Sequence, residues 1–284
     1  MLSAISAEAL KLRRHRATWL LVWIFPILVL IGYSIGIIAQ MVQNNPPAPA
    51  APDLGRWLDN AADFWDATSS GLVRMLAGAF IAVVFAGEYG WNTWKLIVPH
   101  RSRTTLIAAK YVVGLALLYA AFLAAAFIWM VMEWLRNVIA GNPLPEGITA
   151  GGLAQAHWAG FLGGLPTILF TVAFVSLAAV LTRSTVAALV IGIVVVTVEQ
   201  LFRAFGPILS MYMPGLIDLL YQVLPGYHLA NLAEWATDGK AEQVPFPSGE
   251  ILAYDWTTSL AIVAAWTTGL VALTFLRFKR QDIN

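Results

Sequence analysis

The chain has 284 residues, of which 59% are hydrophobic and only 12% are charged. An ordinary soluble domain carries about 25% charged residues, so this chain has too few charges to cover a surface exposed to water. The composition excludes a disordered chain, and the formal net charge of +1 provides no basic field for nucleic acid. The absence of cysteine excludes disulfides and cysteine nucleophiles, and four scattered histidines do not predict a metal site.

Six segments are apolar and long enough to cross the hydrocarbon core of a bilayer, which is about 30 Å thick, as helices. They cover residues 18–41, 70–87, 106–132, 158–181, 185–205 and 254–276. Continuous apolar runs such as 190–198 lack the two-residue alternation of barrel strands. We therefore predict an all-α polytopic membrane protein in which residues 1–284 form a single transmembrane domain.

The lysines and arginines predict how the chain is oriented, because basic residues accumulate on the cytoplasmic side of a membrane. Twelve of the 17 fall at the end of the spans that also holds both termini, and the other five fall at the opposite end. We therefore predict a multi-pass protein of the plasma membrane, the inner membrane in a bacterium, with both termini cytoplasmic.

The longest loop outside the membrane covers residues 206–253. Its first half alternates prolines and glycines with short apolar pieces, such as 214–220, that cannot cross a bilayer. Such pieces predict interfacial or re-entrant helices that dip into the outer leaflet before the last span.

Two pairs of glycines with a spacing of four lie within predicted spans. Gly32 and Gly36 share one face of the first span, and Gly160 and Gly164 share one face of the fourth. This spacing lets another helix approach closely, so we predict helix packing at both pairs. The first pair also frames Ser34 in a G-x-S-x-G pattern, which leaves an intramembrane serine hydrolase as an alternative, without the strand–turn–helix context that such a site needs.

Glu199 is an ionisable residue well inside a predicted span, about five residues from its outer end. Arg203 follows four residues later on the same helix face, so we predict an intramembrane ion pair between them. An intramembrane carboxylate can also carry a coupling ion, and a transporter driven by an ion gradient through Glu199 is therefore a second functional hypothesis.

The first cytoplasmic loop, residues 88–105, combines polar, aromatic and basic residues. Such a segment can lie along the membrane surface and bind lipid through its tryptophans, or it can form a lever that docks a cytoplasmic partner. None of the five lysines follows the glycine pattern of a phosphate-binding P-loop, so any nucleotide is bound by another chain.

This loop resembles the first cytoplasmic loop of type-2 ABC transporter permeases. The residues that carry the resemblance are Gly87, Glu88, Tyr89, Thr93, Pro99, Arg101 or Arg103, and Lys110, with Asn92 in place of the usual glycine. Glu8, Lys11 and Arg14 in residues 1–17 are similar to the amphipathic cytoplasmic helix that precedes the first span of that family. The sequence from Phe278 to Ile283 resembles its frequent carboxy-terminal ending, from which Gln281 departs.

The resemblance implies the membrane subunit of an ATP-driven exporter, which is not itself an enzyme. It implies a pair of permease subunits, identical or different, and two P-loop ATPase subunits that bind ATP and Mg²⁺. Loop 88–105 becomes the coupling helix, with the docking surface formed by Thr93, Trp94, Lys95 and Leu96 and with Arg101 and Arg103 following. Glu88 becomes a polar anchor at the hinge side of that helix. The apolar spans suit a lipophilic or amphipathic cargo such as a peptide antibiotic, a drug or a lipid.

Overall fold

The structure is a computed structural model that describes residues 1–42, 53–90, 94 and 98–282. Six helices within these residues are long and apolar enough to cross a membrane. They are α2 (Arg16–Val42), α5 (Gly71–Gly90), α7 (Arg103–Ile139), α8 (Ala150–Thr182), α9 (Thr185–Leu209) and α12 (Trp256–Lys279). The prediction of an all-α protein with six spans is confirmed.

Short elements fill the connections between the spans. They are α1 (Leu2–Arg14), α3 (Leu54–Ala62), α4 (Phe64–Ala67), the 3₁₀ turn η1 (Val98–His100), α10 (Pro214–Val223), α11 (Pro225–Thr237), and the paired strands β1 (Val244–Pro245) and β2 (Ile251–Leu252). Helices α10 and α11 occupy the loop for which interfacial helices were predicted. Helices α3 and α4 and the strand pair were not predicted.

Side-chain caps explain where several of the long helices begin. Ser102 accepts a hydrogen bond from the backbone N–H of Thr105, and Thr149, Ser184 and Asp255 accept equivalent bonds at the starts of α8, α9 and α12. Each oxygen satisfies one of the backbone donors that a helix leaves free in its first turn. Arg183, with φ 56° in the left-handed region, ends α8 directly before the cap of α9, so the turn between the two spans is very short.

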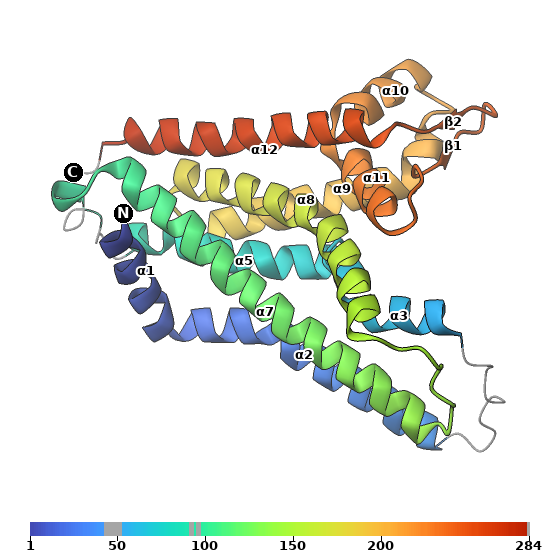
Figure 1. The fold of residues 1–284 in the computed structure, drawn as a ribbon. Helices are drawn as coiled ribbons and strands as arrows, with labels where there is room; N and C mark the ends of the chain where they lie inside the picture. Colours follow the sequence, from blue (N-terminus) through green and yellow to red (C-terminus); the bar gives the residue numbers. More distant parts are fainter. Residues whose placement is uncertain (43–52, 91–93, 95–97, 283–284) are drawn as a thin grey trace.

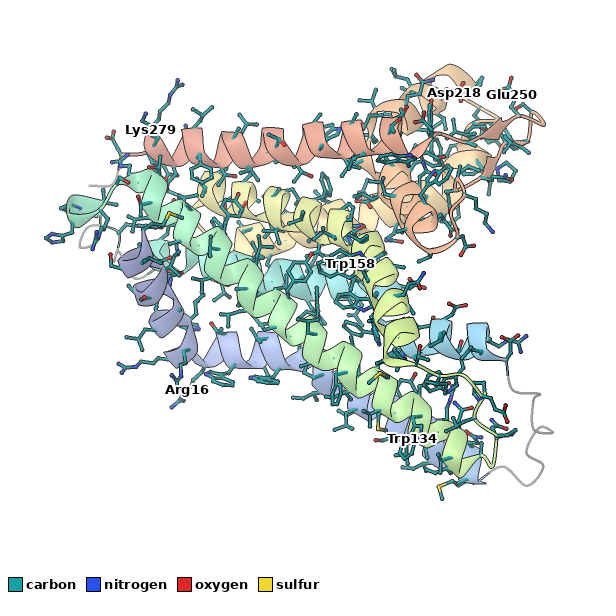
Figure 2. The ribbon with its side chains drawn as sticks, viewed as in Figure 1. Arg16, Trp134, Trp158, Asp218, Glu250 and Lys279 are labelled. Atoms are coloured by element: carbon teal, nitrogen blue, oxygen red, sulfur yellow. The ribbon has the colours of Figure 1, made fainter. Side chains whose placement is uncertain are left out.

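The helices form a bundle with α8 at its centre and both chain termini at one end (Figure 1). Helix α8 packs against α5, α9, α11 and α12, whereas α2 packs chiefly along α7. Figure 2 shows Arg16 and Lys279 toward the end with the termini, and Asp218 and Glu250 at the opposite end. The first part of α8 turns away from the rest of the helix (Figure 1), as expected for Pro166, which removes a backbone donor inside the helix.

Burial is uneven among the spans, and this asymmetry bears on assembly. Helix α8 is the most buried span, while α2, α9 and α12 leave most of their apolar residues uncovered. In a bilayer such faces contact lipid tails or another membrane subunit. The opposite end of the bundle is closed by α11, which packs on α8 and α12 and buries His228 and Asn231.

Candidate functional site

Four charged side chains from three helices meet at the start of the loop between α5 and α7. We call Glu8, Lys11, Glu88 and Lys110 the ion cluster. The Nζ atom of Lys110 lies 2.6 Å from Glu88 Oε1, 3.2 Å from Glu8 Oε1 and 2.5 Å from the carbonyl oxygen of Val84. Lys11 donates to the same Glu88 oxygen, and its Nζ lies 2.5 Å from Glu8 Oε1.

Lys110 and Glu88 at the centre of the ion cluster are buried, whereas Lys11 at its edge is partly exposed, so the charge balance at the centre is structurally important. Lys110 is 1% exposed and Glu88 is 5% exposed. Two ammonium groups face two carboxylates, so each charge that burial removes from water has an opposite charge within hydrogen-bond distance. The cluster therefore fixes α1 to the last turn of α5, at Glu88, and to α7 at Lys110, seven residues after that helix begins.

The other end of the loop is fixed to the carboxy-terminal tail. The guanidinium of Arg103, the first residue of α7, donates to the carbonyl oxygens of Lys279 at 2.8 Å and Gln281 at 2.5 Å. Gln281 in turn donates to the Val180 carbonyl at 2.6 Å and accepts a hydrogen bond from the Tyr89 hydroxyl at 2.6 Å. The end of α5, the start of α7 and the ends of α8 and α12 are thus joined by one hydrogen-bonded network.

Within the loop itself, the structure describes Trp94 and η1. Trp94 is 3% exposed, and its ring lies 4.6 Å from that of Phe278 and 5.2 Å from the Lys110 ammonium. Its side chain packs inward, because an aromatic ring gains more from burial on Phe278 than from contact with water. The assignment of Trp94 to a docking surface stays a prediction. Thr93, Lys95 and Leu96 lie outside the described residues. Arg101 and Arg14 are exposed.

The intramembrane pair differs from the prediction. Glu199 accepts two hydrogen bonds from Arg74 of α5, at 2.5 Å from Nη1 and 2.7 Å from Nη2, and Arg74 also donates to the Thr171 hydroxyl at 3.1 Å. Arg203 instead lies 3.5 Å from Glu242 in the segment between α11 and β1. A bidentate guanidinium from a neighbouring helix holds a carboxylate better than an arginine one turn further along the same helix.

The comparison with known proteins agrees with this architecture. The family model described as "ABC-2 family transporter protein" matches residues 4–199, which is more than half of the chain. The chain belongs to the ABC-2 transporter family. A search of curated proteins gives no significant match to this ABC-2 protein.

The predicted glycine pairs of this ABC-2 protein behave differently. A Cβ atom on Gly160 would lie 2.7 Å from Trp65 Cβ, and one on Gly164 would lie 2.2 Å from the Thr68 hydroxyl oxygen. The residues approached belong to or adjoin α4 rather than another long span. Gly32 and Gly36 have no heavy atom within 4 Å of such a Cβ atom, so they do not mediate packing among the described residues and are exposed on α2.

The alternative hydrolase site finds no support in the geometry. Ser34 donates to the carbonyl oxygen of Leu30 at 2.7 Å, as serines commonly do inside helices. The hydrogen bonds formed by the described residues do not connect this hydroxyl to a histidine or a carboxylate. A serine nucleophile needs such a base, so the G-x-S-x-G pattern here is a coincidence of helix composition.

The sequence did not predict the contacts of Arg74, nor those of Gln281 and Phe278, which were noted only in the carboxy-terminal resemblance. Arg74 was counted only as one of the five basic residues at the end of the spans opposite the termini, although it lies inside the second predicted span at a depth similar to that of Glu199 in the fifth. Two opposite charges at matching depth are a signal for pairing, because an unpaired charge in the membrane is costly. Gln281 and Phe278 carry no comparable signal in the sequence.

Proposed function

We propose that this membrane permease of an ABC transporter receives the conformational change of an ATPase subunit through the loop between α5 and α7. The family assignment identifies the chain as the membrane component of such a transporter. The loop is the proposed site at which the movement of the ATPase is transmitted to the permease, and the networks at its two ends transmit that movement to the helices.

The observation that carries the proposal is that both ends of this loop are tied to polar networks that are partly or fully buried. At its start the ion cluster links α5 to α1 and α7, and at its end Arg103 and Gln281 link α7 to α12 and α8. A displacement of the loop therefore moves five helices as a unit instead of bending a single connection. Packed elements with discrete arrangements transmit small shifts in this way.

In the proposed complex, two permease subunits work with two ATPase subunits, which bind ATP and Mg²⁺. The uncovered apolar faces of α2 and α9 favour a seam between permease copies along these helices, with α5 behind them. A seam lined by apolar side chains suits a lipophilic or amphipathic cargo, and the accumulation of basic residues at the end with the termini supports a cytoplasmic location for that end.

The first experiment is purification from the native membrane in mild detergent, followed by mass spectrometry of the proteins that remain bound. We expect a P-loop ATPase in an amount close to that of the permease. Recovery of the chain without an ATPase, even after crosslinking, would contradict the proposal and favour the ion-gradient transporter.

The second experiment tests transmission through the ion cluster. A single cysteine replacing exposed Gly36 on α2 reports changes near the opposite end of the bundle through its labelling rate, because the chain has no other cysteine. We expect ATP to change this rate in the complex, and Lys110→Met to abolish the change while the ATPase remains bound. Lys240→Met is the matched control, since Lys240 forms an exposed ion pair with Asp238 in the outer loop and its loss should leave the ATP response intact.

A further inference from the structure

A cavity of about 360 Å³ lies between α1, α2 and α7 at the end of the bundle that carries the termini. Its walls are almost entirely apolar and include Leu12, Val22, Leu117 and Ala120. Ligand sites of this size are typically apolar with a few polar groups that fix orientation. The cavity is separate from the ion cluster, which lies on the side of α1 that carries Glu8 and Lys11.

One polar atom in the wall has no partner within the described part of the chain. Thr18 is 3% exposed and lines the cavity, yet its hydroxyl makes no hydrogen bond to the described residues. A buried hydroxyl without a partner costs free energy, so its presence in a cavity wall indicates a ligand that supplies the bond.

The rim of the cavity carries positive charge. Arg13 lines it, and Arg14 and Arg16 follow in the chain; among the described residues none of the three forms an ion pair. Thr18 lies in the first turn of α2, where the backbone N–H groups of Thr18 and Trp19 both donate to the His15 carbonyl, so the arginine side chains supply the attraction for an anion. The ligand therefore combines an apolar body with a negatively charged head.

Two tryptophans place this head at the level of a membrane surface. Trp19 and Trp23 are about half exposed and stack with their ring centroids 5.9 Å apart, and the Trp19 indole N–H donates to the Arg13 carbonyl at 2.5 Å. Exposed tryptophans concentrate where headgroups meet acyl chains. The apolar cavity begins next to Trp19 and Trp23, at the level of the membrane surface, and continues along α2 and α7.

We infer that the cavity between α1, α2 and α7 binds one anionic phospholipid from the adjacent leaflet. An acyl chain fills the apolar cavity, while the phosphate lies near Arg13, the Thr18 hydroxyl and the start of α2. The lipid then supports α1 on one side while the ion cluster holds it on the other. This inference does not depend on the identity of the ATPase or of the cargo.

The test uses the full-length chain in detergent with phosphatidylglycerol or phosphatidylcholine of identical acyl chains, and measures bound lipid by native mass spectrometry. We expect one phosphatidylglycerol per chain, retained in preference to phosphatidylcholine. Arg13→Gln should weaken retention about fivefold, the usual contribution of one basic residue near an anionic surface. Ala120→Trp should abolish it by filling the cavity.

Two controls distinguish binding in this cavity from nonspecific attraction of an anionic lipid to the basic residues of the chain. Arg277→Gln removes an exposed cation in the last turn of α12, at the end of that helix next to the carboxy terminus, and should leave retention unchanged. Thr18→Val keeps the shape of the side chain and removes only the hydroxyl, so it tests the site even if Ala120→Trp fails to fold. It should lower retention.

Thermal unfolding provides an independent readout of the same site. Phosphatidylglycerol should raise the melting temperature of the wild-type chain and not that of Arg13→Gln, because a ligand that binds only the folded state stabilises it. Equal retention of the two lipids, an equal loss in Arg277→Gln, or the same shift with inorganic phosphate in place of the lipid would each overturn the inference.

Discussion

Arg74 of α5 and Glu199 of α9 form a bidentate ion pair, with Nη1–Oε1 and Nη2–Oε2 distances of 2.5 and 2.7 Å, that joins two spans near the end of the bundle opposite the termini. Arg74 is 1% exposed, so the pair is sealed between helices. A carboxylate held in this way is occupied by a protein cation, which argues against its use as the site of a coupling ion.

Removing one member of this pair should destabilise the chain strongly. Arg74→Met leaves the Glu199 carboxylate without its cation in a buried site, and we expect a loss of about 3–5 kcal/mol in the free energy of unfolding. The measurement is chemical unfolding in detergent. The double variant Arg74→Met with Glu199→Met should be less destabilised than the sum of the single variants, and strict additivity would contradict the pairing.

Arg203 provides the matched control for that prediction. Its guanidinium is partly exposed and 3.5 Å from Glu242, so Arg203→Met should cost no more than about 1 kcal/mol. If Arg203→Met proved as harmful as Arg74→Met, the assignment of partners in this part of the structure would be wrong.

The glycines of α8 and α2 should respond differently to a methyl group. Gly160→Ala brings Cβ to 2.7 Å from Trp65 Cβ, which lies too close to the backbone to move aside, and we expect a loss of about 1–3 kcal/mol. Gly32→Ala meets no atom within 4 Å and should leave the stability of the single chain equal or slightly raised. Unfolding curves measure the change in the free energy of unfolding for both variants. Equal changes in Gly160→Ala and Gly32→Ala would contradict the close contact between Gly160 and Trp65.

His228 of α11 should make the stability of the end of the bundle opposite the termini depend on pH. It is fully buried, receives a hydrogen bond from the Ser259 hydroxyl at Nδ1 (3.0 Å), and donates from Nε2 to the Gln222 carbonyl (3.2 Å). Burial lowers the pKa of His228 below its ordinary value of 6.5, so the folded state favours the neutral ring.

The sign of the effect follows from which state binds more protons. Below about pH 6.5 the unfolded chain protonates this histidine before the folded chain does, so stability is complete above that pH and falls as the pH decreases toward the folded-state pKa. Burial also raises the pKa values of Asp63, Asp66 and Glu234, which act in the opposite direction. The test therefore compares unfolding at about pH 7.5 and about pH 5.5 in wild type and in His228→Gln. The variant should lose part of the acid sensitivity, whereas exposed His100→Gln should retain it.

The proposed orientation can be tested by thiol labelling in intact cells, because the natural chain contains no cysteine. A membrane-impermeant maleimide should label Ser248→Cys in the outer loop and should not label His100→Cys at η1 until the cells are permeabilised. Both positions are exposed in the structure, so accessibility within the protein does not limit either reaction. The reverse pattern would place the termini outside the cytoplasm.

Hydropathy was sufficient to predict the six spans, because apolar length is the property that a bilayer selects. The third span was predicted to end at residue 132, but α7 continues to Ile139. Glu133 receives hydrogen bonds from Arg136 and Asn137 at helical spacing, so polar residues that hydropathy discounts still extend the helix.

Partners distant in the sequence were harder to predict. Glu88, Lys110, Glu8 and Lys11 were identified separately from a family resemblance, and only the packing of α1 against α7 shows that they form one cluster. The burial of Trp94 depends on Phe278, which lies more than half the chain away and whose position no local pattern fixes.

The most direct test of the central proposal is crosslinking between the α5–α7 loop and the ATPase. The complex is purified from cells carrying His100→Cys or Ser248→Cys and treated with a short thiol–amine crosslinker. The proposal predicts a covalent adduct between permease and ATPase from His100→Cys and none from Ser248→Cys. A copurifying ATPase that forms no adduct from His100→Cys, or forms one from Ser248→Cys, would contradict it.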